Sequence, residues 1–472
     1  MATDREIYNT VRNKIRAGKA GADLFAWLGF VYRKLPATPQ TRKQAEFYLA
    51  LAHQIDPSSE EFLADLVRLK ANSGQAVPAL ALIEQWKRRQ KITPLLAKME
   101  ARLRGTLTPG QIDAAVKKPA VYDFLDSSSF TDGAPLSLFF GNFDSGHLDF
   151  TSTFKQETGE SFLSINPVKL IAQLNAPSPH SLLYYLARDL EPRILFYSIA
   201  GISKLHENVD YSIFAALKEH FDFSLVLVCY DLAKPNYERI VAPLFRISDA
   251  VVCLDMQIDL ERYGISNEKS FHSFVPLDFQ YFYDDGRERD IDVCFVGSRA
   301  NHYRGRQDLV DLLGSAGISV LAAGGATDPI SKTEYTDLLR RSKISLNLSW
   351  TLIFSFDLHP LLDKPQVTTH LKGRVIESMR CGALLFEDDR SVLPPVFKEG
   401  EHYVRYSTSN IVEKARYYLS HDDERRDIAE RGRKTAEQHY SPSAFWKSVF
   451  EKLEMARAAS SPLTIRRNFF EI

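Results

Sequence analysis

The sequence contains few cysteines and no long hydrophobic run. The four cysteines, Cys229, Cys253, Cys294 and Cys381, lie far apart and show no CxxC or zinc-like spacing. This spacing excludes a disulfide scaffold and predicts buried free thiols, as in a reducing cytosol. No uninterrupted apolar run approaches the roughly 18 residues of a membrane span. The first ten residues, MATDREIYNT, lack the apolar core of a signal peptide. We therefore expect a soluble, cytoplasmic protein without a membrane span.

Net charge is also nearly absent, because 59 Lys and Arg oppose 60 Asp and Glu. No chain-wide basic field attracts nucleic acid or an anionic membrane. The 30 Phe and 20 Tyr are scattered through core-like segments rather than interleaved with basic residues, so we expect no nucleic-acid partner. The balance hides an asymmetry: residues 1–105 hold 18 basic and 10 acidic side chains, whereas the remainder has an acidic excess of nine. Residues 1–105 are therefore predicted to form a separate module.

This first module has the pattern of an all-α unit. The chain length predicts about three domains, and segments such as EEFLADLVRLKA place apolar residues at helical spacing. The stretches AEFYLALAHQIDP and SGQAVPALALIEQW, with a helix between them, resemble a degenerate pair of tetratricopeptide repeats. A plain helical bundle without a binding role is the alternative interpretation.

The rest of the chain alternates short apolar runs with amphipathic segments. PLSLFFG, RILFYSIAG, FSLVLVCYD and DAVVCLD form a first series, and DVCFVGS, ISVLAAGG, KISLNLS and GALLFED a second. Such continuously apolar strands are typical of parallel sheets covered on both faces. We predict an α/β fold with two Rossmann-like domains, 106–280 and 281–472, that face a cleft and follow the helical module.

The stretch HLKGRVIESMRCGALLFEDD contains the most informative side chains. Arg374, Glu377 and Arg380 are expected to share one helical face, on a helix whose N-terminus points at the crevice between the domains. An anion there would gain from free backbone amides and the helix dipole. A carboxylate can accept both hydroxyls of a ribose, and an arginine can bind a pyrophosphate. An ordinary salt bridge on a solvated helix is the alternative.

The spacing R-x-x-E-x-x-x-x-G-A, followed by LPPVFKEGEHYVRY and a helix ending RGRKTAEQHY, resembles the group 1 glycosyltransferases. In particular, it is similar to the branch related to the spore-maturation protein CgeB, over about Ser224 to Tyr440. The resemblance implies a GT-B fold that binds a nucleotide-diphosphate sugar, here expected to be a UDP-sugar, with Glu377 on the donor ribose. Many relatives have a second acid eight positions upstream, where this chain has Thr369. Donor-sugar contacts are therefore not assigned from that acid.

A second group of candidate donor-binding residues follows the strand DVCFV. Gly297 would let the backbone approach a phosphate, and the loop continues through Ser298 and Arg299 to Arg304. A basic helix start is electrostatically unfavourable unless an anion binds there, which favours a phosphate site over a solvated turn. Lys372 is a further candidate for phosphate binding.

Candidates for a catalytic base lie on the opposite side of the predicted cleft. The string FFGNFDSGHLDF places Asp144, His147 and Asp149 after the first apolar strand. An inverting transferase needs a base to deprotonate its acceptor. The alternative for each residue is a structural role in a turn.

Asp290 and Asp292, separated by one residue, form a DxD motif, but this motif stands before the strand and not after it. Ligands of open α/β sheets bind at the opposite, carboxyl ends of the strands. We therefore interpret these acids as part of a linker and predict neither an obligatory metal nor any cofactor besides the donor substrate.

The function predicted from these observations is transfer of a sugar from a nucleotide-diphosphate sugar to a macromolecular, protein acceptor recruited by residues 1–105. One alternative is a nucleotide-sugar epimerase or phosphorylase on the same fold, since a fold alone does not set chemistry. The other is a non-catalytic helical-repeat adaptor with a degenerate transferase body.

Overall fold

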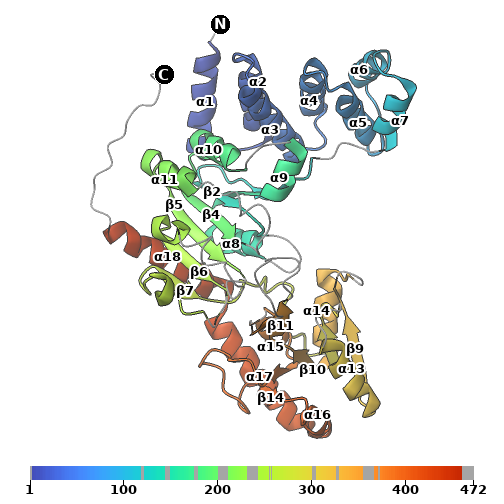
Figure 1. Ribbon diagram of the computed structural model, residues 1–472, viewed down its shortest axis with the longest axis vertical. Coiled ribbons are helices and arrows are strands. Elements are labelled where there is room, and N and C mark those ends of the chain that lie inside the picture. The colour runs from blue at the N-terminus through green and yellow to red at the C-terminus, as the bar shows by residue number, and fades with distance from the viewer. Residues whose placement is uncertain are drawn as a thin grey trace.

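The computed structural model describes residues 3–117, 122–143, 149–174, 179–199, 211–230, 243–254, 256, 258–299, 305–325, 329–353, 366–369, 371 and 373–459. Figure 1 shows an array of helices above a first sheet, with a second sheet below it. Within the described part of the chain, no helix is both long and apolar enough to cross a membrane.

Seven helices form the N-terminal helical region and stand side by side in Figure 1. They are α1 (Asp4–Arg16), α2 (Ala22–Lys34), α3 (Pro39–Ile55), α4 (Glu60–Asn72), α5 (Ala76–Lys87), α6 (Pro94–Arg104) and α7 (Pro109–Lys117). Side chains of Thr3, Thr38, Ser59 and Thr93 accept hydrogen bonds from the first turns of α1, α3, α4 and α6. These caps satisfy backbone N–H groups that have no partner within the helix. The local sequence thus determines where each of these helices begins.

The first sheet has seven strands in the order β1-β3-β2-β4-β5-β6-β7. The strands are β1 (Leu125–Ser129), β2 (Leu136–Phe140), β3 (Ser161–Ile165), β4 (Ile194–Ile199), β5 (Ser224–Cys229), β6 (Ala250–Cys253) and β7 (Ser270–His272). Only the β1–β3 pairing is antiparallel among these described strands. The helices α8 (Phe150–Thr158), α9 (Pro167–Leu174), α10 (Pro179–Leu190) and α11 (Tyr211–His220) alternate with the strands.

The second sheet has five strands in the order β14-β13-β10-β8-β9, and its pairings are parallel. Its strands are β8 (Ile291–Val296), β9 (Val320–Ala323), β10 (Ser342–Asn347), β13 (Leu384–Asp388) and β14 (Val404–Tyr406). Its helices are α13 (Arg306–Ser315), α14 (Lys332–Arg341), α15 (Arg374–Arg380), α16 (Ile411–Ser420) and α17 (Asp422–His439). A separate antiparallel pair consists of β11 (Trp350–Ile353) and β12 (Gln366–Thr369). The predicted α/β architecture with two sheets and a helical N-terminal region is confirmed.

The last described helix, α18 (Pro442–Ala459), returns to the first sheet (Figure 1). Trp446 is buried against Phe139 and Phe196, with ring centroids 6.4 and 5.6 Å apart, and its indole N–H donates to Thr153 Oγ1 at 3.1 Å. Burial of an aromatic side chain of this size contributes strongly to a core. The C-terminal helix therefore ties the end of the chain to the first sheet.

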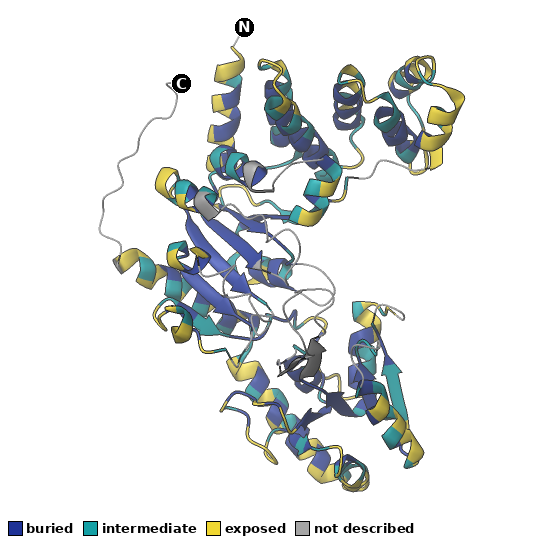
Figure 2. Cartoon of the chain, viewed as in Figure 1, coloured by how far each residue is buried: buried dark blue, intermediate teal, exposed yellow. Residues whose placement is uncertain are grey.

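The helical region shares one hydrophobic core with the first sheet. Figure 2 shows buried residues on the strands of the first sheet and on the helices above it. Phe47 of α3 stacks on Phe124 at a centroid distance of 5.3 Å, and both belong to the same buried cluster as residues of the strands. At the same interface, Asp189 of α10 is fully buried beneath α1, α2 and α3. The helical region is thus a packed part of the body rather than a detachable arm.

Candidate functional site

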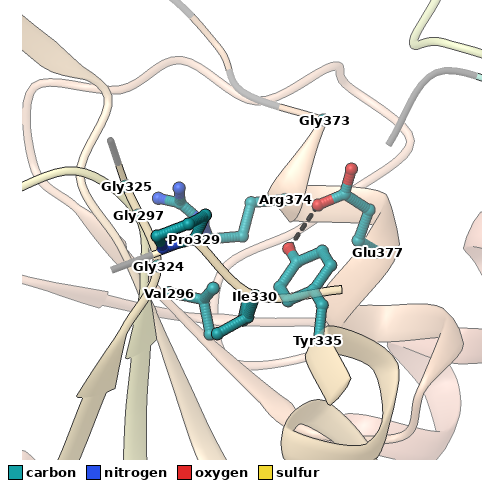
Figure 3. Close-up of a pocket in the computed structure, with 10 residues that line it drawn as sticks. All are labelled: Val296, Gly297, Gly324, Gly325, Pro329, Ile330, Tyr335, Gly373, Arg374 and Glu377. Carbon is teal, nitrogen blue, oxygen red and sulfur yellow. Dashed lines mark hydrogen bonds between the residues drawn. The ribbon is translucent and has the colours of Figure 1, made fainter. Parts of the chain in front are cut away.

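A pocket of about 390 Å³ opens at the carboxyl ends of β8 and β9. In this sheet the first strand, β8, lies between β9 and β10, so the chain leaves β8 in one direction and returns on its other side. Open α/β sheets bind their ligands at such a reversal of strand order. The lining residues (Figure 3) are Val296, Gly297, Gly324, Gly325, Pro329, Ile330, Tyr335, Gly373, Arg374 and Glu377.

Two glycines make room for the pocket wall. Gly297 has a φ of +153°, and a Cβ added there would lie 2.5 Å from Nη2 of Arg374. Gly325 has a φ of +109°, and a Cβ there would lie 2.8 Å from the Cα of Ser298. Positive φ and close approach are both conditions that only glycine meets without strain. The strand-end loops therefore need glycine to bring their backbones to the pocket.

Arg374 supplies the positive charge of the pocket. Its Nη1 donates to Oδ1 of Asn347 at 3.3 Å, and its guanidinium lies 5.2 Å from the ring centre of Phe295. Its Nε is buried and has no hydrogen-bond partner in the described part of the chain. A guanidinium presents five N–H donors, so several remain for a bound anion.

Glu377 lies one turn further along α15 and also faces the pocket (Figure 3). The hydroxyl of Tyr335, from α14, donates to Oε2 of Glu377, and the carboxyl group is only 8% exposed. Burial raises the pKa of Glu377, although the Tyr335 hydroxyl and the charges of Arg374 and Lys332 oppose this shift. The structure therefore brings the two predicted donor-binding side chains, Arg374 and Glu377, into one pocket.

Arg380 does not share that face, so this part of the sequence prediction is wrong. Its Nη1 pairs with Glu437 of α17 at 2.7 Å, and its guanidinium lies 3.8 Å from the ring centre of Phe279. Six residues of an α-helix turn the side chain by about 600°, which is far from a whole number of turns. Arg380 therefore joins α15 to α17 instead of lining the pocket.

The remaining candidates for donor binding surround the loop after β8. The Ser298 carbonyl accepts a hydrogen bond from Nη1 of Arg306 at 2.7 Å, which holds the loop against the start of α13. Arg299 follows and is half-buried. Arg304 and Lys372 lie outside the described residues. Which of these residues bind a phosphate stays a prediction.

Of the three candidate bases, His147 and Asp144 lie outside the described residues. Asp149 precedes α8 and is 4% exposed. Its carboxylate pairs with Lys332 of α14 and accepts the backbone N–H of Asp278 at 2.9 Å. Burial raises the pKa of Asp149, against the effect of these two donors. Asp149 thus connects the first sheet to the segment between β7 and β8 and to α14 beside the second sheet.

Sequence reasoning missed three polar residues near the pocket: Lys332, Tyr335 and Asn347. Lys332 and Tyr335 sit in an ordinary amphipathic helix, where no local signal distinguishes them. Asn347 had a signal, because it is a polar residue at the carboxyl end of the apolar strand β10. Polar groups at that end of a parallel strand are placed where ligands bind.

The DxD acids lie at the amino end of β8, the end remote from the pocket. Asp290 pairs with Arg341 at 2.5 Å and Asp292 with Lys343 at 2.7 Å. Over the residues described, no group of three or more His, Cys, Asp and Glu could hold a metal ion. The two acids therefore act as ion-pair partners of α14 and β10.

Comparisons with known proteins bear on the fold and on residues 299–451. Residues 299–451 match the family model described as "Glycosyl transferase-like". A search of curated proteins found no match. Among solved structures, a glycosyltransferase from Rickettsia africae ESF-5 is 12% identical with a TM-score of 0.50, over 69% of this chain and 100% of that one.

Two further solved structures have TM-scores just below that value. Anabaena Alr3699/HepE in complex with UDP is 12% identical, with a TM-score of 0.49, over 68% of this chain and 99% of that one. The sucrose-phosphate synthase from Thermosynechococcus elongatus is 11% identical, with a TM-score of 0.46, over 69% of this chain and 100% of that one. The predicted GT-B-type fold is confirmed, and the family match is confined to residues 299–451.

Proposed function

We propose that this protein is a glycosyltransferase that uses a nucleotide-diphosphate sugar, with a UDP-sugar as the first candidate donor. The observation that carries the proposal is the pocket at the strand reversal, where Arg374 and Glu377 face one space between glycine loops. An arginine beside a buried carboxylate matches the two ends of a nucleotide: its diphosphate and its ribose hydroxyls. The CgeB-like branch, the tetratricopeptide likeness and a cytoplasmic location stay predictions.

In this proposal Arg374 neutralises the diphosphate and Glu377 accepts the ribose hydroxyls. Negative charge builds up on the diphosphate as the sugar leaves, so a fixed guanidinium beside it lowers the barrier. Tyr335 holds one oxygen of Glu377 in place, which leaves the other oxygen for the ribose. The pocket residues thereby bind the donor and stabilise the leaving group.

The donor proposal is tested by calorimetry with UDP on the full chain. Arg374→Ala and Glu377→Gln should each weaken binding by about 1.5–3 kcal/mol, the contribution of a hydrogen bond to a charged group. Arg426→Ala and Glu401→Gln change exposed side chains that do not line the pocket, and they serve as matched controls. Unchanged affinity in both pocket variants would refute the assignment. Failure of the unaltered protein to bind UDP-, GDP- or TDP-sugars would favour the adaptor alternative.

We further propose that the acceptor is a protein and that the helical region recruits it. Lys87 is committed to ion pairs with Glu84 and Glu100, and Arg88 donates to the carbonyl of Val116. The neighbouring cations Arg89 and Lys91 are exposed and form no ion pair with the described residues. Exposed cations at one end of a helical array can steer an acidic partner, with an effect that salt weakens.

Removing residues 1–105 would be a poor test, because it would uncover the core that the helices share with the first sheet. The full chain with Arg89→Glu and Lys91→Glu is the better variant. Lys434→Glu and Lys447→Glu make the same charge change on α17 and α18, where both side chains are exposed. Transfer of labelled glucose from UDP-glucose to the protein fraction of a lysate should fall several-fold only in the first variant, while donor hydrolysis stays unchanged. Equal transfer by both variants would refute recruitment by this surface.

A further inference from the structure

A second buried acid, Glu387, lies close to the pocket on β13. Its side chain is 0% exposed, and Nδ2 of Asn347, its neighbour in register on β10, donates to its Oε2 at 2.7 Å. Its Oε1 is buried with no hydrogen-bond partner among the described residues. A buried carboxylate without a cation or a full set of donors is costly, whereas the neutral acid is tolerated.

Asn347 connects this acid to the pocket. The Oδ1 of the same amide accepts a hydrogen bond from Nη1 of Arg374 at 3.3 Å. A guanidinium can only donate, so the amide must turn its oxygen to Arg374 and its N–H₂ to Glu387. The three side chains therefore form a hydrogen-bonded chain from β13 through β10 to Arg374 in the pocket wall.

We propose that Glu387 is a positioning residue of the donor pocket: as a neutral acid it leaves the charge of Arg374 to an anionic ligand, and as a carboxylate it competes for that charge. The proposal rests on the proposed function, because it takes the anion to be the diphosphate of the donor. Glu387 does not itself line the pocket, but on this proposal its protonation controls how much positive charge the pocket offers to a ligand.

Among the described residues, none of the other groups around Glu387 forms an ion pair with its carboxyl group. On β14 its register neighbour Arg405 turns to Tyr403 and Glu399, and the hydroxyl of Tyr406 donates to the carbonyl of Asn347. On its own strand, Asp388 accepts from both the backbone and the hydroxyl of Ser349.

Beyond the strand, the hydroxyl of Ser391 is buried beside Glu387, and Arg374 on α15 acts on the acid through space. Burial raises the pKa of Glu387 to about 8, against the weaker effects of Asn347, Ser391 and Arg374 and with a small contribution from Asp388. Glu387 is therefore mostly neutral at pH 7 and gains its charge as the pH passes about 8.

The sign of the pH effect follows directly. Below the pKa of Glu387, about 8, the pocket offers the full charge of Arg374 to a ligand. Above this pKa, the carboxylate of Glu387 opposes the binding of an anion. The carboxylate of Glu387 is separated from the bound anion by two hydrogen bonds, the amide of Asn347 and the guanidinium of Arg374. In a partly buried medium, a unit charge at such a separation changes the affinity for the anion by about tenfold. Anion affinity should therefore fall as the pH rises from 7 to 9, and the fall should depend on Glu387.

The test compares the unaltered protein with Glu387→Gln, which keeps an oxygen for Asn347 but cannot ionise. Glu451→Gln makes the same change at an exposed glutamate of α18 and serves as the control. Binding of UDP, and separately of inorganic pyrophosphate, is measured from pH 6.5 to 9.5. Infrared difference spectroscopy follows the carbonyl band of protonated carboxylic acids, which should be weaker at pH 7 in Glu387→Gln than in the unaltered protein.

The expected result is that the ratio of affinities, Glu387→Gln over unaltered protein, rises about tenfold across this range, whereas the Glu451→Gln ratio stays flat. A flat ratio for Glu387→Gln, or an acid band at pH 7 that this substitution leaves unchanged, would overturn the inference even if UDP binds and transfer occurs. Pyrophosphate binding with the expected pH dependence, without UDP binding, would uphold the inference and refute the nucleotide donor. Failure of both anions to bind would overturn both proposals.

Discussion

Replacing Asp189 should destabilise the helical region and the first sheet together. This carboxylate, on α10, is fully buried. The three tyrosines that bind it precede it in the sequence by 181, 157 and 141 residues. Hydroxyls of Tyr8, Tyr32 and Tyr48 donate to it at 2.5, 2.6 and 2.8 Å, and Nε of Arg188 donates at 2.9 Å. One side chain therefore joins three helices of the helical region to the first sheet.

The size of the effect follows from the number of donors. A single Tyr48→Phe removes one hydrogen bond to a charged acceptor, which is worth about 1.5–3 kcal/mol. Asp189→Ala leaves three hydroxyls and a guanidinium without their acceptor, and removing one partner of such a buried charge costs about 3–5 kcal/mol. Domains have total stabilities of about 5–15 kcal/mol, so this loss is a large fraction. Asp189→Asn should lie between the two variants, because its amide oxygen still accepts.

The assay is urea denaturation with two signals. Circular dichroism follows the helices, and fluorescence follows Trp446, which is buried against the first sheet, in a background where Trp27, Trp86 and Trp350 are replaced by Phe. Asp113→Ala, at an exposed residue of α7, is the matched control and should change stability by no more than about 0.5 kcal/mol. The two signals should shift together in Asp189→Ala. A shift below about 1 kcal/mol, or a separate helical transition with the fluorescence transition unmoved, would refute the argument that the regions share one core.

Two further predictions concern turnover. Turnover should survive EDTA within a few-fold, since arginines can neutralise a diphosphate without a cation; complete loss that manganese or magnesium restores would refute this. If Asp149 serves mainly to bind Lys332, then Asp149→Asn and Lys332→Met should lower kcat by similar factors, and the double variant should be no worse than either. If Asp149 is instead the catalytic base, only Asp149→Asn should abolish transfer while UDP affinity is retained.

The strands and part of the pocket could be predicted because their signals are local. Apolar runs such as those of β5 and β13 are buried along their whole length in the structure. Arg374 and Glu377 could be identified from their spacing and from the glycine and strand that follow them. Three residues of a helix bring two side chains to neighbouring positions on one face, so no tertiary information was needed. The same reasoning, applied over six residues of the helix, wrongly placed Arg380 on the face of Arg374 and Glu377.

The rest depends on contacts between distant segments. Nothing near Tyr8, Tyr32 or Tyr48 indicates a common acceptor, because each tyrosine lies in a different helix and Asp189 in a fourth. The pairing of Asp149 with Lys332 crosses from one sheet to the other over 183 residues. A buried polar group needs partners, but the sequence does not say which distant residue supplies them.

The arrangement around Arg374 explains why its charge is available at all. Two buried acids, Glu377 and Glu387, lie near it, and either could neutralise it in an ion pair. Instead, the hydroxyl of Tyr335 binds Glu377 and the amide of Asn347 binds Glu387, and Arg374 forms no ion pair with the described residues. These neutral donors bind one oxygen of each acid without adding positive charge, and burial raises the pKa of both. A guanidinium kept in this way is preorganised for an anion, because no internal ion pair has to break before the ligand binds.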